Sequence, residues 1–212
     1  MKQERIMRKL QFGISALCTI LLTFIYSGSS LASEIFKKNT ISVQAVTGAV
    51  FSPFLIGRER PSLNYSKLNL RLGWMLDNPG ESALLPGNFE PLLEITGSDI
   101  FTGYGNYMAG GTALLRYNFV PKESRIIPYV QAGGGILYTD ADEDRNQTVI
   151  GNSIEFSLQG GAGLHWMIKK SLSMDFEGTF EHISNAGLSD RNAGSNGAGG
   201  FVGFTYYFDA PQ

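Results

Sequence analysis

The sequence predicts an all-β fold, an eight-stranded antiparallel transmembrane β-barrel of the outer-membrane type. Three observations predict it: an export signal, a two-residue hydrophobic period through the rest of the chain, and an unusual composition. Charged residues make up 17% of the chain, below the roughly 25% typical of soluble domains. Aromatic residues make up 12%, and glycine occurs 26 times. A barrel whose alternate residues face lipid accounts for this mixture.

Residues 1–32 have the organisation of a secretory signal peptide. Four basic residues precede an apolar segment from Leu10 to Tyr26, and Ser30-Leu31-Ala32 forms a small-x-small cleavage site. The apolar segment is shorter than the ~20 residues that a membrane-spanning helix needs, which favours cleavage over a permanent anchor. The predicted organisation is therefore a signal peptide, 1–32, followed by a barrel domain, 33–212.

Eight later segments carry the period of two residues that a β-strand produces. The clearest is Ile154–Ile168, where the even positions are apolar or glycine and the odd positions are mostly polar or glycine. Its length matches a tilted strand that crosses a bilayer better than the roughly 5–6 residues usual in soluble domains. In chain order the predicted strands are 41–51, 68–76, 89–96, 107–119, 126–138, 154–168, 172–180 and 202–208.

The apolar face of these strands is predicted to point outward, to lipid. The polar faces carry charges that can pair inside a narrow lumen, namely Arg71, Arg116, Glu155, Asp175 and Glu177. Aromatic residues gather toward strand ends, as interfacial girdles require. Eight strands also leave an interior that side chains just fill. The alternative is a soluble periplasmic barrel with its apolar face inside.

The connections alternate between short turns and longer polar loops. Short turns at 120–125 and 169–170 alternate with polar connections at 139–150 and 187–197. In this class of barrel the short turns face the periplasm and the long loops face outside. The strand that ends near Ser184 therefore runs outward. The long 77–88 segment does not fit this pattern, because it falls on the periplasmic side.

Several classes of function are excluded. The single cysteine, Cys18, lies in the signal peptide, which rules out disulfides and thiolate chemistry in the mature chain. A net charge of -2 gives no support to a nucleic-acid partner. The acidic cluster at 140–144 lacks the features of an EF-hand and is interpreted as a solvated loop, so no metal or cofactor is expected. The motif at 57–60 is interpreted as surface ion pairs, with phosphate binding as the alternative.

Two histidines remain as candidates for chemistry. His165 falls on the inward face and is interpreted as a hydrogen-bonded lumen residue. His182 and Ser184 continue the outward register, ~6.6 Å apart along one strand. A serine hydroxyl becomes a useful nucleophile when a neighbouring base takes its proton. The spacing therefore predicts a hydrolytic pair on the lipid-facing wall, and the alternative places both residues in a solvated loop.

The heptapeptide H-I-S-N-A-G-L from His182 to Leu188, followed by Asn192-x-Gly194, resembles the active-site signature of the lipid A 3-O-deacylase (PagL) family. The resemblance implies an outer-membrane barrel that hydrolyses the 3-O ester-linked acyl chain of lipid A in lipopolysaccharide, without a cofactor. It implies that His182 is the base and Ser184 the nucleophile.

The same resemblance makes Asn185, Asn192 and the backbone around Gly187 candidates for binding the oxyanion. Asn196 stands where the best-known enzyme of the family has a glutamate. An asparagine can accept a hydrogen bond from the imidazole, but it offers no negative charge.

Two other acids lie near this motif. Asp190 is a possible substitute from the loop, whereas Glu181 should point into the lumen. The alternative function is a non-catalytic outer-membrane barrel with a structural, adhesive or lipid-binding role, and Asn196 is its main support.

Overall fold

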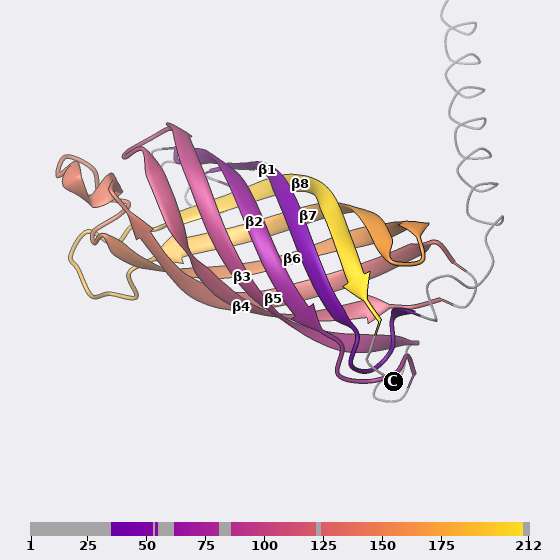
Figure 1. Cartoon of the computed structure of the whole chain (residues 1–212). Coiled ribbons are helices and arrows are strands. Elements are labelled where there is room, and N and C mark those ends of the chain that lie inside the picture. The colour runs from indigo at the N-terminus through magenta and orange to yellow at the C-terminus, as the bar shows by residue number, and fades with distance from the viewer. Residues whose placement is uncertain (1–34, 53, 55–61, 81–85, 122–123, 210–212) are drawn as a thin grey trace, which may run out of the picture.

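The computed structural model describes residues 35–52, 54, 62–80, 86–121 and 124–209. In these residues eight antiparallel strands form a closed barrel, in which each strand pairs with its sequence neighbours and β1 pairs with β8 (Figure 1). The predicted fold class is confirmed. The strands are β1 (Ile41–Phe51), β2 (Asn64–Trp74), β3 (Gly87–Thr102), β4 (Tyr107–Phe119), β5 (Ile126–Thr139), β6 (Ile154–Lys169), β7 (Leu172–Ser184) and β8 (Ser195–Phe208). The signal peptide and the 57–60 motif lie outside the described residues.

Four strands extend several residues beyond their predicted bounds. β2 begins at Asn64, β3 runs from Gly87 to Thr102, β7 continues to Ser184, and β8 begins at Ser195. The predicted end of the second strand, at residue 76, is wrong, because β2 ends at Trp74. The predicted connection 187–197 is also wrong at its end, and the turn between β7 and β8 covers 185–194. The ladder continues past the apolar alternation because backbone groups pair whatever their side chains are. His182 pairs with Asn196 in this extension.

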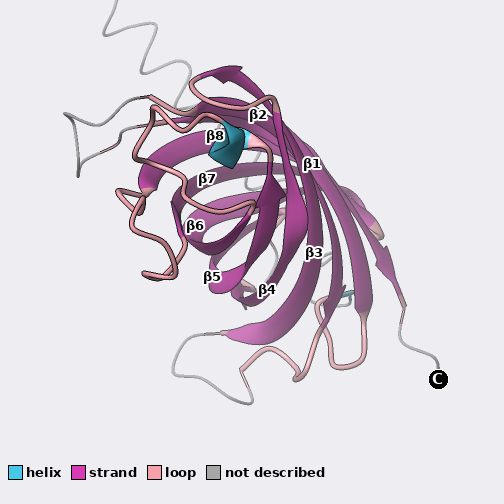
Figure 2. Cartoon of the chain, turned by 90° about the vertical axis from the view of Figure 1, so that its left-hand side faces the viewer, coloured by secondary structure: helices cyan, strands magenta, loops and turns pink. Residues whose placement is uncertain are grey.

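Helical structure is minor in the part of the chain that the structure describes. A 3-10 helix, η1 (Ala141–Glu143), lies in the loop between β5 and β6. Figure 2 shows this helix at the mouth of the barrel. No helix in the described ranges is long and apolar enough to cross a membrane.

The barrel wall is apolar outside and polar inside. Leu93 is 68% exposed and Ile95 is 64% exposed, whereas their inward neighbour Glu94 is 3% exposed and Arg116 is fully buried. Apolar side chains exposed in this number are stable on a barrel wall only when lipid covers them. The arrangement agrees with the predicted outward apolar face and contradicts the soluble alternative with an apolar interior.

The buried polar side chains form a connected ionic network. Arg71 donates to Glu94 at 2.7 Å and to both carboxylate oxygens of Glu177 at 2.6 and 3.0 Å. The Arg116 guanidinium lies 4.3 Å from the centre of the Tyr129 ring. His165 stacks on the same ring and its Nδ1 lies 2.7 Å from Asp175 Oδ1, so this histidine is a lumen residue, as predicted. Burying these charges carries a large desolvation cost, which their pairing and hydrogen bonds offset.

Two clusters of buried apolar side chains lie in the lumen, one on the loop side of the ionic network and one on the turn side. The cluster at the turn end includes Phe36, which is completely buried and packs its ring 5.0 Å from that of Tyr207. Phe36 belongs to the segment before β1, which the sequence did not place in the core. The other members of this cluster are Ile35, Met75, Val120, Ile127 and Met167.

Candidate active site

His182, Ser184 and Asn196 form a hydrogen-bonded chain at the loop end of β7 and β8. His182 Nε2 lies 3.1 Å from Ser184 Oγ, and His182 Nδ1 lies 2.8 Å from Asn196 Oδ1. The amide oxygen can only accept, so Nδ1 carries the proton and donates it to Asn196. Nε2 is then the acceptor for the Ser184 hydroxyl, which is the tautomer that a general base needs.

The strand register explains why these three residues meet. His182 and Ser184 are two residues apart on β7, so their side chains share a face, and His182 lies directly opposite Asn196 on β8. On the other side, β6 places Leu158 beside His182 and Phe156 beside Ser184. The polar chain is therefore bordered by apolar wall. The structure brings the three residues together, while their roles in catalysis stay a prediction.

The turn after Ser184 is built around Asn185, which is fully buried. Its Oδ1 accepts from the N–H of Gly187 at 3.1 Å, and its Nδ2 donates to the carbonyl of Arg191 at 3.0 Å. Ala186 and Gly187 adopt positive φ values of 53° and 84°. The sequence suggested Asn185 and the backbone around Gly187 as candidates for binding the oxyanion. In this structure the Gly187 N–H and an N–H of Asn185 Nδ2 donate within the turn, so both residues also shape it.

Asn192 differs from the other two oxyanion candidates. Its Oδ1 accepts from the backbone N–H of Asn185 at 3.0 Å, which fixes the orientation of the amide. With the oxygen held in this way, the Nδ2 group is the part of Asn192 that can donate to a substrate. The structure thus separates one candidate donor from two turn-forming residues.

Gly194 allows the backbone of the turn to approach the histidine ring. A Cβ at this position would lie 3.4 Å from His182 Cε1 and 2.9 Å from the carbonyl oxygen of Ile183, and φ is 68°. Both the close approach and the left-handed conformation favour glycine. The sequence places this residue in the Asn192-x-Gly194 element, but its role in the turn is visible only in three dimensions.

The two other acids near the motif have different surroundings. Glu181 is buried in the lumen, where it pairs with Lys67 at 2.9 Å and accepts from the Tyr65 hydroxyl at 2.8 Å. Its inward orientation is as predicted. Asp190 is exposed on the turn. Since Asn196 already accepts from Nδ1, the histidine does not need either carboxylate for its orientation.

The acidic loop at 140–144 has a structural role. Asp140 accepts hydrogen bonds from the backbone N–H groups of Asn106 and Tyr107 and from the Asn106 side chain. Burial acts to raise the pKa of Asp140, but these hydrogen bonds outweigh it and lower the pKa. Within the described residues, no group of three or more histidine, cysteine or acidic side chains is arranged to hold a metal ion.

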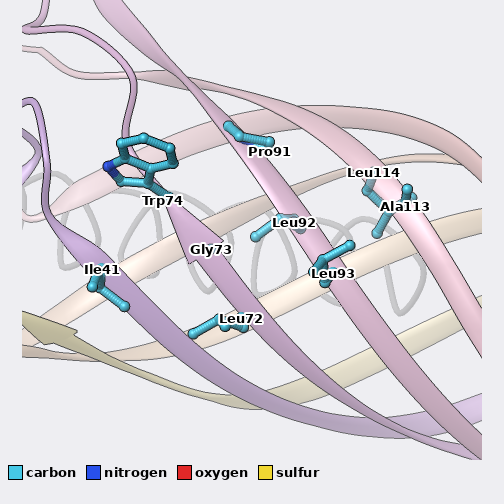
Figure 3. A pocket seen from close by; sticks show the side chains of 9 residues that line it. All are labelled: Ile41, Leu72, Gly73, Trp74, Pro91, Leu92, Leu93, Ala113 and Leu114. Carbon is cyan, nitrogen blue, oxygen red and sulfur yellow. The ribbon is translucent and has the colours of Figure 1, made fainter.

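An apolar groove of about 450 Å³ lies on a different part of the wall, over β1–β4 (Figure 3). Its lining includes Ile41, the first residue of β1, and Trp74, the last residue of β2. These positions lie at the turn end of the barrel. β7 runs in the same direction as β1, so Ser184, its last residue, lies at the opposite, loop end. The groove is therefore separate from the hydrogen-bonded chain.

A sequence profile of the lipid A 3-O-deacylase (PagL) family matches residues 64–205. The chain belongs to this family. The match covers β2 to β7, most of β8, and all three residues of the polar chain. The motif at 182–194 thus lies within the matched region. In a separate comparison, no curated protein matches the sequence of this chain.

Two solved structures show the same fold as the PagL-family barrel. The crystal structure of the outer membrane enzyme PagL is 22% identical, with a TM-score of 0.55, and the alignment covers 76% of this chain and 97% of that one. The crystal structure of Neisserial surface protein A (NspA) is 13% identical, with a TM-score of 0.58, covering 81% of this chain and 100% of that one. At these identities the likeness concerns the fold.

Proposed function

We propose that this PagL-family barrel is a lipid A deacylase that hydrolyses the 3-O ester-linked acyl chain by a serine–histidine mechanism. The observation that carries the proposal is the hydrogen-bonded chain from Asn196 through His182 to Ser184. Family membership supports lipid A as the substrate class. A hydrolytic pair on an apolar outer wall suits a substrate whose acyl chains lie in a bilayer.

The proposal includes the location of the protein. A signal peptide at 1–32 directs export, and the barrel inserts into the outer membrane with its short turns in the periplasm. β7 then runs outward, and Ser184 lies near the outer leaflet, where lipopolysaccharide is found. Lipid A can approach the wall from the side, because the apolar neighbours Leu158 and Phe156 face the membrane.

In the first half of the reaction, Ser184 Oγ attacks the ester carbonyl while His182 Nε2 takes the hydroxyl proton. Asn196 keeps its hydrogen bond to Nδ1–H and holds the imidazolium in place. Asn192 Nδ2 is the proposed donor to the oxyanion of the tetrahedral intermediate. When the intermediate collapses, the C–O bond to the sugar breaks and His182 returns the proton to the leaving 3-hydroxyl.

In the second half, water attacks the acyl-enzyme ester while His182 removes a proton from the water. The new tetrahedral intermediate collapses, the bond from the acyl carbon to Ser184 Oγ breaks, and His182 returns the proton to Oγ, which releases the fatty acid and restores the hydroxyl. These steps use protein side chains and water. They require that the imidazole is neutral at the start of each half-reaction.

Mass spectrometry of lipid A tests the proposal. Full-length protein is expressed in an outer membrane with Ser184→Ala as the inactive variant and Ser189→Ala, on the same turn, as the matched control. We expect the wild type and Ser189→Ala to remove one ester-linked acyl chain and Ser184→Ala to remove none. Unchanged lipid A with folded wild-type protein, or deacylation that survives Ser184→Ala, would overturn it.

A non-catalytic barrel is the competing function, and the neutral Asn196 favours it. In that case wild-type protein leaves lipid A unchanged, while Asn196→Glu or Asn196→Asp supplies the missing charge and produces deacylation. The same mass measurement therefore separates the two functions.

A further inference from the structure

The turn that carries the proposed oxyanion donor has little packing of its own. It leaves β7 at Ser184, passes through three residues with positive φ and returns to β8 at Ser195. Ala186, Gly187 and Leu188 are all exposed. The hydrogen bonds through Asn185 order part of the turn, and exposed turns of this kind open at low free-energy cost unless other segments also support them.

The loop between β5 and β6 supplies that support. It projects from the same end of the barrel as the β7–β8 turn (Figure 1). The N–H of Ala193 donates to the carbonyl of Thr148 at 2.9 Å, and the N–H of Gly194 donates to that of Val149 at 3.0 Å. Gly151 of the same loop lies so close to the turn that a Cβ there would overlap the Arg191 carbonyl.

Arg191 joins the two segments through its side chain. Its Nη1 donates to the carbonyl of Asp144 at 3.1 Å, and its Nη2 donates to those of Asp142 and Gly151 at 3.0 and 3.3 Å. The backbone carbonyl of Arg191 accepts from Asn185 Nδ2. One residue thus holds the β5–β6 loop with its guanidinium and the residue after Ser184 with its backbone. Its planar fork of donors suits several acceptors at once, which a lysine cannot match.

The supporting loop is itself ordered from within. The Gln147 side chain is buried, with Nε2 donating to the carbonyl of Ala141 at 3.1 Å and Oε1 accepting from the N–H groups of Val149 and Ile150 at 2.6 and 2.8 Å. The carbonyl groups that Arg191 and Gly194 contact are therefore part of a fixed surface rather than a free loop.

From these contacts we infer that Arg191 is a positioning residue for the reaction, which clasps the β5–β6 loop to the β7–β8 turn and thereby holds Asn192 and Gly194 against Ser184 and His182. The inference rests on the proposed function for its kinetic consequence. It assigns no contact between Arg191 and the substrate. A donor or ring displaced by about 1 Å can lower the rate by ~100-fold.

Two variants and a control test this inference in the full-length protein. Arg191→Gln removes the guanidinium, Arg191→Lys keeps its charge without the fork, and Arg145→Gln removes an equal charge from an exposed position on the same loop. The first readout is hydrogen exchange at the Ala193 and Gly194 amides in detergent micelles, which does not depend on any activity. The second is kcat and KM on purified lipid A in mixed micelles.

We expect Arg191→Gln to speed exchange at both amides at least ~10-fold and to lower kcat by ~10- to 100-fold with little change in KM. Arg191→Lys should fall between Arg191→Gln and wild type, and Arg145→Gln should match wild type. Unchanged exchange in Arg191→Gln overturns the inference that Arg191 holds the β5–β6 loop and the β7–β8 turn together. A rise in KM at constant kcat overturns the positioning role, because it would make Arg191 a substrate-binding residue. If wild-type protein has no activity but Arg191→Gln still speeds exchange at the Ala193 and Gly194 amides, the proposed function fails. The structural role of Arg191 in joining the loop to the turn is then retained.

Discussion

Asn196→Asp replaces the neutral acceptor of the His182 hydrogen bond by a charged one. The two side chains have the same length, so the oxygen that lies 2.8 Å from Nδ1 keeps its place. The proposed mechanism makes His182 positive when Ser184 attacks. The new carboxylate should therefore stabilise the transition state more than the ground state, and kcat should rise.

The size of the effect follows from the hydrogen bond. A neutral hydrogen bond contributes about 0.5–1.5 kcal/mol, and one to a charged group contributes about 1.5–3 kcal/mol. The difference of about 1–1.5 kcal/mol corresponds to roughly a 10-fold increase in kcat. A serine protease loses ~10⁴-fold in kcat when an asparagine replaces the aspartate of its triad, but that loss does not apply here. In that case the histidine takes the wrong tautomer, whereas Asn196 Oδ1 already imposes the correct one.

The assay is the steady-state rate of acyl-chain release from purified lipid A in detergent micelles, measured between pH 6 and 9. Asn196→Ala is the opposite test and should lower kcat, because the imidazole loses its orientation. Asp190→Asn is the control for a general change in charge on this part of the surface. The reasoning is refuted if Asn196→Ala has no effect, or if Asn196→Asp leaves kcat unchanged in a protein that folds normally.

Two further predictions concern the barrel itself. Arg71→Met leaves the buried carboxylates of Glu94 and Glu177 without their cation and should destabilise the barrel by about 3–5 kcal/mol, measured by urea unfolding in micelles. An unfolding free energy equal to that of wild type would show that the network is not stabilising. Leu93→Arg, near the middle of β3 on the lipid face, should cost about 2–4 kcal/mol in a bilayer unfolding experiment. A cost near zero would mean that lipid does not cover this wall.

The sequence contained most of the information about the wall of the barrel. A period of two residues persists wherever one face meets lipid and the other meets the lumen, so the middle of each strand was predictable. The even register also placed His182, Ser184 and Asn196 on one face. The strand ends were less predictable, because Asn196 and its neighbours Ser195 and Gly197 lack apolar alternation although their backbones continue the ladder.

Local sequence patterns could not predict the contacts that hold the site together. Arg191 binds carbonyl groups 40 to 49 residues away in the chain, and backbone carbonyls leave no trace in the sequence of the loop that supplies them. Phe36 gave no signal either, since a single aromatic residue before the first strand has no periodicity. Asn185 resembled an oxyanion donor by its position in the motif, and its burial within the turn became visible only with the three-dimensional structure.

The pairing of β7 with β8 also assembles the hydrogen-bonded chain of His182, Ser184 and Asn196. A slip of one residue between these strands would turn Asn196 toward the lumen and leave His182 without its acceptor. Before these two strands pair, the chain lacks the hydrogen bond between His182 and Asn196. Under the proposed mechanism, hydrolysis therefore begins only once β7 and β8 have joined in this register.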